Sequence, residues 1–165
     1  MREVARLETL DISLHRKIEF APVAEAQADD AVWQDVLRWA KQTLAPAHGK
    51  AIVFAVAHMG FDLAELNEDH VRVDRQTVYV VVPPLTVAVE LLPGETEVIG
   101  SNLDSAETSA LLENAKQAFL QQVKADPQLT QRARQSGERA LRGLCAGLGF
   151  TQVVFVPQLP LLGGT

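Results

Sequence analysis

The sequence predicts an α+β fold, a largely antiparallel sheet of five to six strands with a C-terminal helical pair packed on one face. Strand patterns fill most of the chain before residue 100 and two long helical patterns follow, so the two kinds of element are mostly segregated. Helices on one side of an antiparallel sheet are the economical way to bury both. With 165 residues, 47% of them hydrophobic and 22% charged, the chain suits one globular domain, expected at 1–157 with a tail at 158–165.

Two strands are expected in the first part of the chain. From Leu10 to Phe20 apolar and polar residues alternate, which is typical of a strand with one buried face. The continuous apolar run Ala51–Ala57 favours a strand buried on both faces. A bend should follow at Gly60 and Asp62, because glycine admits a positive φ and an aspartate can accept hydrogen bonds from turn N–H groups.

A helix is expected between these strands, after a small acidic loop at 24–30. It opens at Asp30, runs to Leu44, and has a broad apolar face that contains both tryptophans, Trp33 and Trp39. This face could pack on the sheet, or it could contact a partner protein or a membrane surface. We favour core packing, and keep partner contact as the alternative.

The middle of the chain reads as a hairpin followed by a further strand. The segment 70–73 should pair with 77–82, and Pro83 and Pro84 must end that strand because proline cannot donate to a ladder. Residues 85–91 alternate again and predict the next strand.

Two helical segments fill residues 104–149. Asp104 and Glu107 have capping-box spacing, and Asp126-Pro127 restarts a helix with proline at its first position. Gly149 is the expected stop. The pattern is compatible with two helices or with one sharply bent helix, and a last strand is expected at 151–156.

The order of these parts resembles a bacterial family known as domain of unknown function 4230. The resemblance rests on the strand 10–20, the turn Gly60-Phe61-Asp62-Leu63, the strand end Val82-Pro83-Pro84, the stretch 87–98 and the helices ending at Leu148-Gly149-Phe150. It implies an architecture and names no reaction. This chain departs from the family in its heavier Trp33–Trp39 helix and in Phe61, where a smaller apolar residue is more usual.

The resemblance also implies a location. Members of the family usually have a membrane-spanning helix or signal ahead of this domain, and the chain starts at the domain boundary. We therefore expect a membrane-anchored gene product that displays the domain on the extracytoplasmic side. The 165 residues themselves contain no apolar run of the roughly 18–20 residues needed to span a bilayer, and no signal peptide.

Groups able to do catalysis are few, and no catalytic residues are predicted. No phosphate-binding glycine loop, nucleophile elbow or His-Glu-x-x-His pair occurs. Weak metal candidates flank the bend, although their spacing fits no known ligand pattern and no cofactor is expected: His58, Asp62, His70 and Asp74. An acidic patch reads as solvated surface, with a weak calcium site as its alternative: Glu65, Glu68, Asp69 and Asp74.

The remaining charge and thiol chemistry also reads as structural. A net charge of −6 argues against nucleic-acid binding, and the arginines at 132, 134, 139 and 142 read as a solvated helix face. Cys145 lies in an apolar helical segment and is expected to be a small buried side chain.

These observations favour a non-enzymatic, extracytoplasmic binding or interaction module, whose partner is an unidentified protein or a membrane surface and which could form a homo-oligomer. The contact residues proposed for it are Trp33, Trp39, Phe119 and Leu144. The alternative is a carrier of a small apolar ligand or lipid, with a pocket between sheet and helices lined by Leu112, Phe119 and Leu144. An enzyme with an unfamiliar site ranks third.

Overall fold

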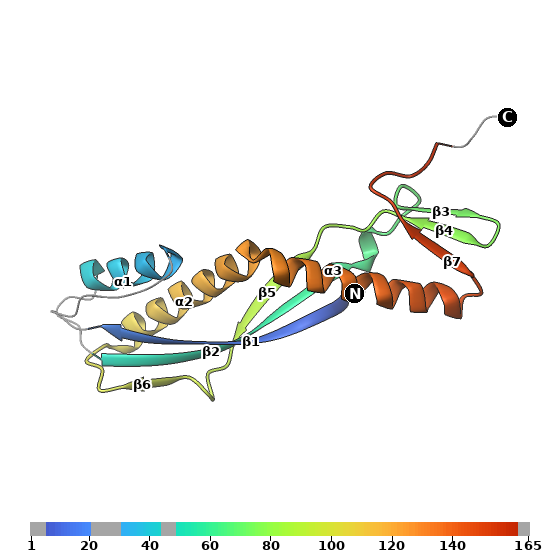
Figure 1. Cartoon of the computed structure of the whole chain (residues 1–165). Helices are drawn as coiled ribbons and strands as arrows, with labels where there is room; N and C mark the ends of the chain where they lie inside the picture. Colours follow the sequence, from blue (N-terminus) through green and yellow to red (C-terminus); the bar gives the residue numbers. More distant parts are fainter. Residues whose placement is uncertain (1–5, 21–30, 44–48, 162–165) are drawn as a thin grey trace. The chain divides into compact units, whose positions relative to one another are not determined.

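The computed structural model describes residues 6–20, 31–43 and 49–161 of the chain. It confirms the α+β class, with two sheets and three α-helices in this part of the chain (Figure 1). The elements, in chain order, are β1 (Arg6–Phe20), α1 (Ala31–Thr43), β2 (Gly49–Asp62), the 3-10 turn η1 (Leu63–Glu65), β3 (Val71–Asp74), β4 (Thr77–Val80), β5 (Thr86–Leu91), β6 (Glu97–Ile99), α2 (Ser105–Ala125), α3 (Pro127–Gly147) and β7 (Gln152–Phe155).

The described strands divide between two sheets. The first, sheet A, has four strands in the order β1-β2-β5, with the short β6 also paired to β2 in antiparallel fashion. The second, sheet B, has three strands in the order β3-β4-β7. In sheet B, β3 and β4 form the expected antiparallel hairpin, whereas β7 pairs with β4 in parallel, Val78 opposite Val153.

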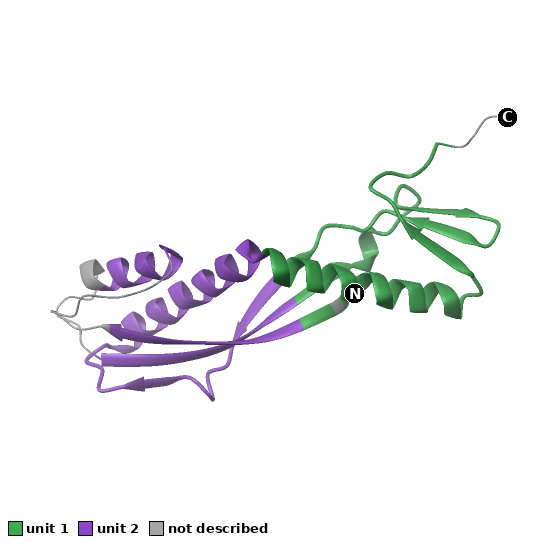
Figure 2. Cartoon of the chain, viewed as in Figure 1, with its two compact units in different colours: residues 1–10, 59–86, 127–165 green, residues 11–58, 87–126 purple. Residues whose placement is uncertain are grey.

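The chain separates into two compact units, each built from several segments (Figure 2). Unit 1 consists of residues 1–10, 59–86 and 127–165, and unit 2 of residues 11–58 and 87–126. Because β1 and β2 each contribute residues to both units, the units are not successive stretches of sequence.

Unit 2 contains α1, α2 and most of sheet A. Along β2 every second residue from Ala51 to Ala57 is fully buried, and the residues between them are half-buried. The helices α1 and α2 lie over one face of this part of the sheet (Figure 2). Three of the four buried residues between Ala51 and Ala57 are alanines, so the helices can approach this face closely. The buried residues of α2 are Leu111, Ala115, Ala118, Phe119 and Val123.

Trp33 is the largest fully buried side chain of unit 2, with 2% of its surface exposed. Its ring meets that of Phe119 edge to face at a centroid distance of 4.9 Å. Its indole Nε1–H donates a hydrogen bond of 3.0 Å to Gln122 Oε1, and the guanidinium of Arg16 lies 5.2 Å from the ring centroid. Trp33 therefore joins α1, α2 and β1 through apolar, polar and cation–π contacts.

Unit 1 contains sheet B, α3 and the end of β2. Phe61 is 1% exposed and lies against Gly137 of α3. A Cβ atom at Gly137 would stand 2.2 Å from Phe61 Cε2, which is far inside van der Waals contact. The glycine therefore makes room for the ring, and the large residue at 61 is accommodated by the absence of a side chain on the helix.

The helical termini follow the sequence closely. Both reciprocal hydrogen bonds of the Asp104–Glu107 capping box are present. Residues 104–149 form two helices and not one bent helix, since α2 ends at Ala125, Asp126 is extended, and α3 starts at Pro127. Gly149 has a φ of +95°, the left-handed conformation expected just after a helix.

Three local expectations need correction. Strand β2 continues through Gly60 to Asp62, so the bend falls at η1, and Gly60 lies inside a strand. Between Ala51 and Ala57 one face of β2 is fully buried and the other only half-buried, whereas burial of both faces was expected. The short strand β6 was not anticipated. The loop expected at 24–30 lies outside the described residues.

Candidate functional site

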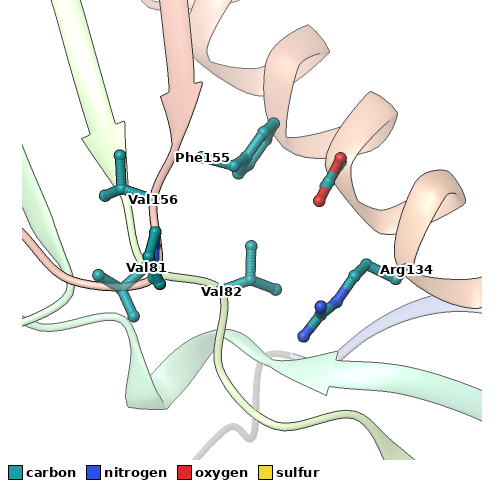
Figure 3. A pocket seen from close by; sticks show the side chains of 7 residues that line it. Val81, Val82, Arg134, Phe155 and Val156 are labelled. Carbon is teal, nitrogen blue, oxygen red and sulfur yellow. The ribbon is translucent and has the colours of Figure 1, made fainter. Parts of the chain in front are cut away.

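Unit 1 contains a pocket with a volume of about 380 Å³. It lies between the ends of β4 and β7 and the helix α3 (Figure 3). Its lining consists of Val81, Val82, Arg134, Glu138, Phe155, Val156 and Pro157. Five of these seven residues are apolar, and the two charged ones lie one helical turn apart on α3.

Hydrogen bonds between the strand ends position the apolar wall. Val156 N–H donates to the carbonyl of Val80 at 3.0 Å and so continues the parallel pairing beyond β7. Val81 N–H donates to the carbonyl of His70 at 2.8 Å. β4 ends at Val80, and Pro83 and Pro84 prevent the strand from continuing because proline has no N–H to donate. The side chains of Val81 and Val82, between the strand end and the prolines, are half-buried.

The opposite wall comes from α3. Arg134 is exposed and Glu138 is half-buried, and both line the pocket. One helical turn after Glu138, the guanidinium of Arg142 lies 4.9 Å from the centroid of the Phe155 ring. This cation–π contact joins α3 to β7 and helps to hold the ring in the pocket wall.

The pocket suits recognition of a group with an apolar body and a polar or charged end. Four branched or aromatic side chains offer apolar contact, and Arg134 and Glu138 offer one donor-rich cation and one acceptor. Volumes of roughly 300–1,000 Å³ are typical of small-molecule sites.

The contact residues expected from the sequence lie in different surroundings. Trp33 and Phe119 pack on each other in the core of unit 2, each 2% exposed. Trp39 is half-buried on α1. Leu144 of α3 is 52% exposed and Leu148, one turn later, is 76% exposed. The pocket described above includes none of Leu112, Phe119 and Leu144.

The weak metal candidates have separate partners. His58 Nδ1 lies 2.9 Å from Asp11 Oδ1, and its Nε2 lies 3.4 Å from Glu90 Oε2. The Asp62 carboxylate accepts a hydrogen bond from Ala64 N–H and caps η1.

The other two candidates, and the structural prolines, lie in unit 1. His70 Nδ1 is 2.9 Å from Asn67 Oδ1, and Asp74 ends β3 opposite Thr77. Pro83 is fully buried and Pro84 exposed. Among the residues that the structure describes, no three His, Cys, Asp or Glu side chains gather where they could hold a metal ion.

In the described part of the chain, Cys145 and Glu19 have shifted pKa values. Partial burial raises the pKa of the Cys145 thiol, which keeps it protonated near neutral pH. A hydrogen bond from Lys17 and the charges of Lys17 and Lys50 lower the pKa of Glu19. Neither group lines the pocket.

Comparison with known proteins identifies the family. Residues 1–155 match the family described as "Protein of unknown function (DUF4230)". The chain belongs to this family. The match covers nearly all of the DUF4230 chain, including every described helix and strand. No curated protein and no solved structure matches it. Among the described residues, no helix has both the length and the apolar character needed to cross a membrane.

Sequence reasoning did not find the pocket of this DUF4230 domain. Arg134 belonged to an arginine group interpreted as a solvated face, and Phe155 to a terminal strand. The pocket depends on the parallel pairing of β4 with β7, which joins Thr77 to Gln152 across 75 residues. A local pattern contains no signal for a pairing of that separation.

Proposed function

We propose that this domain is a non-enzymatic binding module, displayed outside the cytoplasm by a membrane anchor elsewhere in the gene product, and that the pocket of unit 1 is its binding site. The pocket is the observation that carries the proposal. It combines an apolar wall with an arginine and a glutamate, at a volume of about 380 Å³.

The occupant is a group with an apolar body and an anionic or polar end. The apolar body contacts Val82, Phe155 and Val156, and the anionic end pairs with the exposed guanidinium of Arg134. Such a group could belong to a partner protein. The carrier of a small apolar ligand or lipid remains the second candidate, because the volume lies within the range of small-molecule pockets.

The probe that tests the site is anilinonaphthalene sulfonate, an aromatic body with one anionic group. The folded chain should bind it saturably with one site per chain and a rise in fluorescence. Val82→Phe, which fills the pocket, and Arg134→Glu, which reverses the charge, should each weaken binding. Arg132→Glu is the matched control, since Arg132 is exposed on the same helix outside the pocket lining.

The outcomes separate the site from non-specific binding. Equal binding by Val82→Phe and the wild-type chain, with both shown to be folded by their thermal transitions, would contradict the assignment. Native mass spectrometry of the purified chain tests the carrier directly. An excess mass that leaves on denaturation would support it, and a clean mass would favour the interaction module.

The location is tested separately on the full-length gene product. We expect it in the membrane fraction, with this domain digested by protease added to cells whose cytoplasm stays sealed. Recovery of the product wholly in the cytosolic fraction would contradict the anchor, whatever the pocket binds.

A further inference from the structure

Strand β1 forms an edge of sheet A. In the order β1-β2-β5, β1 pairs with β2, and no described strand lies along its other side. β1 has 15 residues, whereas strands usually have about five or six. A long edge of this kind offers a row of backbone N–H and C=O groups to another strand.

The devices that usually protect such an edge are weak here. β1 contains no proline, and the inward-facing Arg16 lies over the ring of Trp33 in its own chain. The charges on the outward face alternate in sign along the strand: Asp11, Lys17 and Glu19. The edge therefore carries a pattern that a strand of suitable sequence can match.

We propose that the partner of this edge is a second copy of the same chain, paired antiparallel through β1 about a two-fold axis at Leu14. In this register Asp11 of each copy stands opposite Lys17 of the other on the solvent face. Asp11 and Lys17 expose 56% and 57% of their side chains, so a second copy can reach both, while within the chain Asp11 pairs with His58 at 2.9 Å and Lys17 with Glu19 at 2.6 Å. The two Leu14 side chains meet at the axis on the other face.

The two registers centred further along the strand, on His15 and on Arg16, match less well. With the axis at His15, Asp11 would face Glu19 of the other copy and the two His15 rings would face each other. With the axis at Arg16, Arg16 would face itself and His15 would face Lys17. Like charges directly opposite on paired strands are unfavourable, whereas opposite charges are favourable. Of the registers centred on Leu14, His15 and Arg16, charge complementarity therefore favours the one centred on Leu14.

A two-fold axis at Leu14 pairs the β1 edge of one copy with the β1 edge of the other, so the assembly contains two copies and no more. A two-fold contact uses the same surface on both copies and leaves no free β1 edge for a third. Leu14, Asp11 and Lys17 belong to unit 2, and no residue of β1 lines the pocket, so the inference stands or falls independently of the proposed function.

The experiment is a charge-reversal cycle read by sedimentation equilibrium over a dilution series of the whole chain. The wild-type chain should pass from monomer to dimer. Lys17→Asp and Asp11→Lys each place like charges opposite one another twice, and each should weaken the dimer roughly tenfold. The double variant Asp11→Lys with Lys17→Asp restores opposite charges and should recover dimerisation.

A matched control and a folding check keep the cycle decisive. Lys124→Asp makes the same change of charge on an exposed residue of α2, away from the edge, and should leave the dimer intact. Circular dichroism confirms that each variant is folded. A wild-type chain that stays monomeric at the highest concentration reached would overturn the inference. So would a Lys17→Asp variant that dimerises like wild type, or a double variant that fails to recover.

Discussion

The two units use their apolar residues differently. In unit 2, Trp33, Phe119 and Leu111 are fully buried around the alanine-rich face of β2. In unit 1, Phe61 and Met59 are fully buried, but Val81, Val82, Phe155 and Val156 remain half-buried around a pocket. Unit 2 is thus a closely packed core, whereas the half-buried side chains of unit 1 fit the proposal that its pocket is a binding site. A fully packed core leaves no room for a ligand, whereas partly covered apolar side chains beside charged ones do.

The largest expected effect is on the core of unit 2. Trp33→Ala should lower the free energy of unfolding by about 3–5 kcal/mol, because it leaves a cavity and removes the contacts with Phe119 and Gln122. Trp39→Ala should cost clearly less, since Trp39 is half-buried. Urea denaturation measures both, and equal losses would contradict the view of α1 as a core helix anchored by Trp33.

The next effect concerns the close packing in unit 1. Gly137→Ala should destabilise the chain by about 1–3 kcal/mol, because the new methyl group would overlap the Phe61 ring. Gly143→Ala is the matched control in the same helix. Nothing lies within 4 Å of a Cβ at Gly143, so this change should stabilise by up to about 1 kcal/mol.

A double variant sharpens that comparison. Adding Phe61→Leu to the Gly137→Ala chain should recover part of the stability that Gly137→Ala loses, because a smaller side chain at position 61 relieves the overlap. Thermal and urea unfolding of the four variants of this cycle give the coupling. Strict additivity of the two changes would show that the ring and the helix do not interact as described.

A smaller effect is expected in the β3–β4 turn. Arg75 has a φ of +55°, a left-handed conformation that is unfavourable for a residue with a side chain. Arg75→Gly should therefore raise the free energy of unfolding by about 0.5 kcal/mol, after the entropic cost of glycine is included. A loss of stability would mean that the arginine side chain contributes more than its backbone conformation costs.

The smallest expected effect is chemical rather than structural. Burial raises the pKa of Cys145, so at a given pH less of it is thiolate than in an unfolded chain. Alkylation in the folded chain should thus be slower than in urea at the same pH, and should accelerate as the pH rises towards the raised pKa. Mass spectrometry follows the reaction. Faster alkylation in the folded state would point to an activated thiol.

The sequence was most informative where the determinants are local. The Asp104–Glu107 box, Pro127 and Gly149 act within one or two turns, and each lies where it was expected. The alternation in β1 likewise reflects one strand and its buried face.

Long-range determinants could not be read in this way. The composition of sheet B depends on the parallel pairing of β7 with β4, two strands that lie far apart in the sequence. β6 has three residues, all exposed, and so lacks the alternation that marks a strand. The fit of Phe61 against Gly137 needs two distant positions to be considered together.

The most direct test of the division between the units is amide NMR of the whole chain during titration with anilinonaphthalene sulfonate. The account predicts shift changes at 81–82, 134–138 and 155–156, around the pocket, while the amides of α1 and α2 stay unchanged. Shift changes centred on Trp33 and Phe119, with none around the pocket, would contradict the assignment of recognition to unit 1.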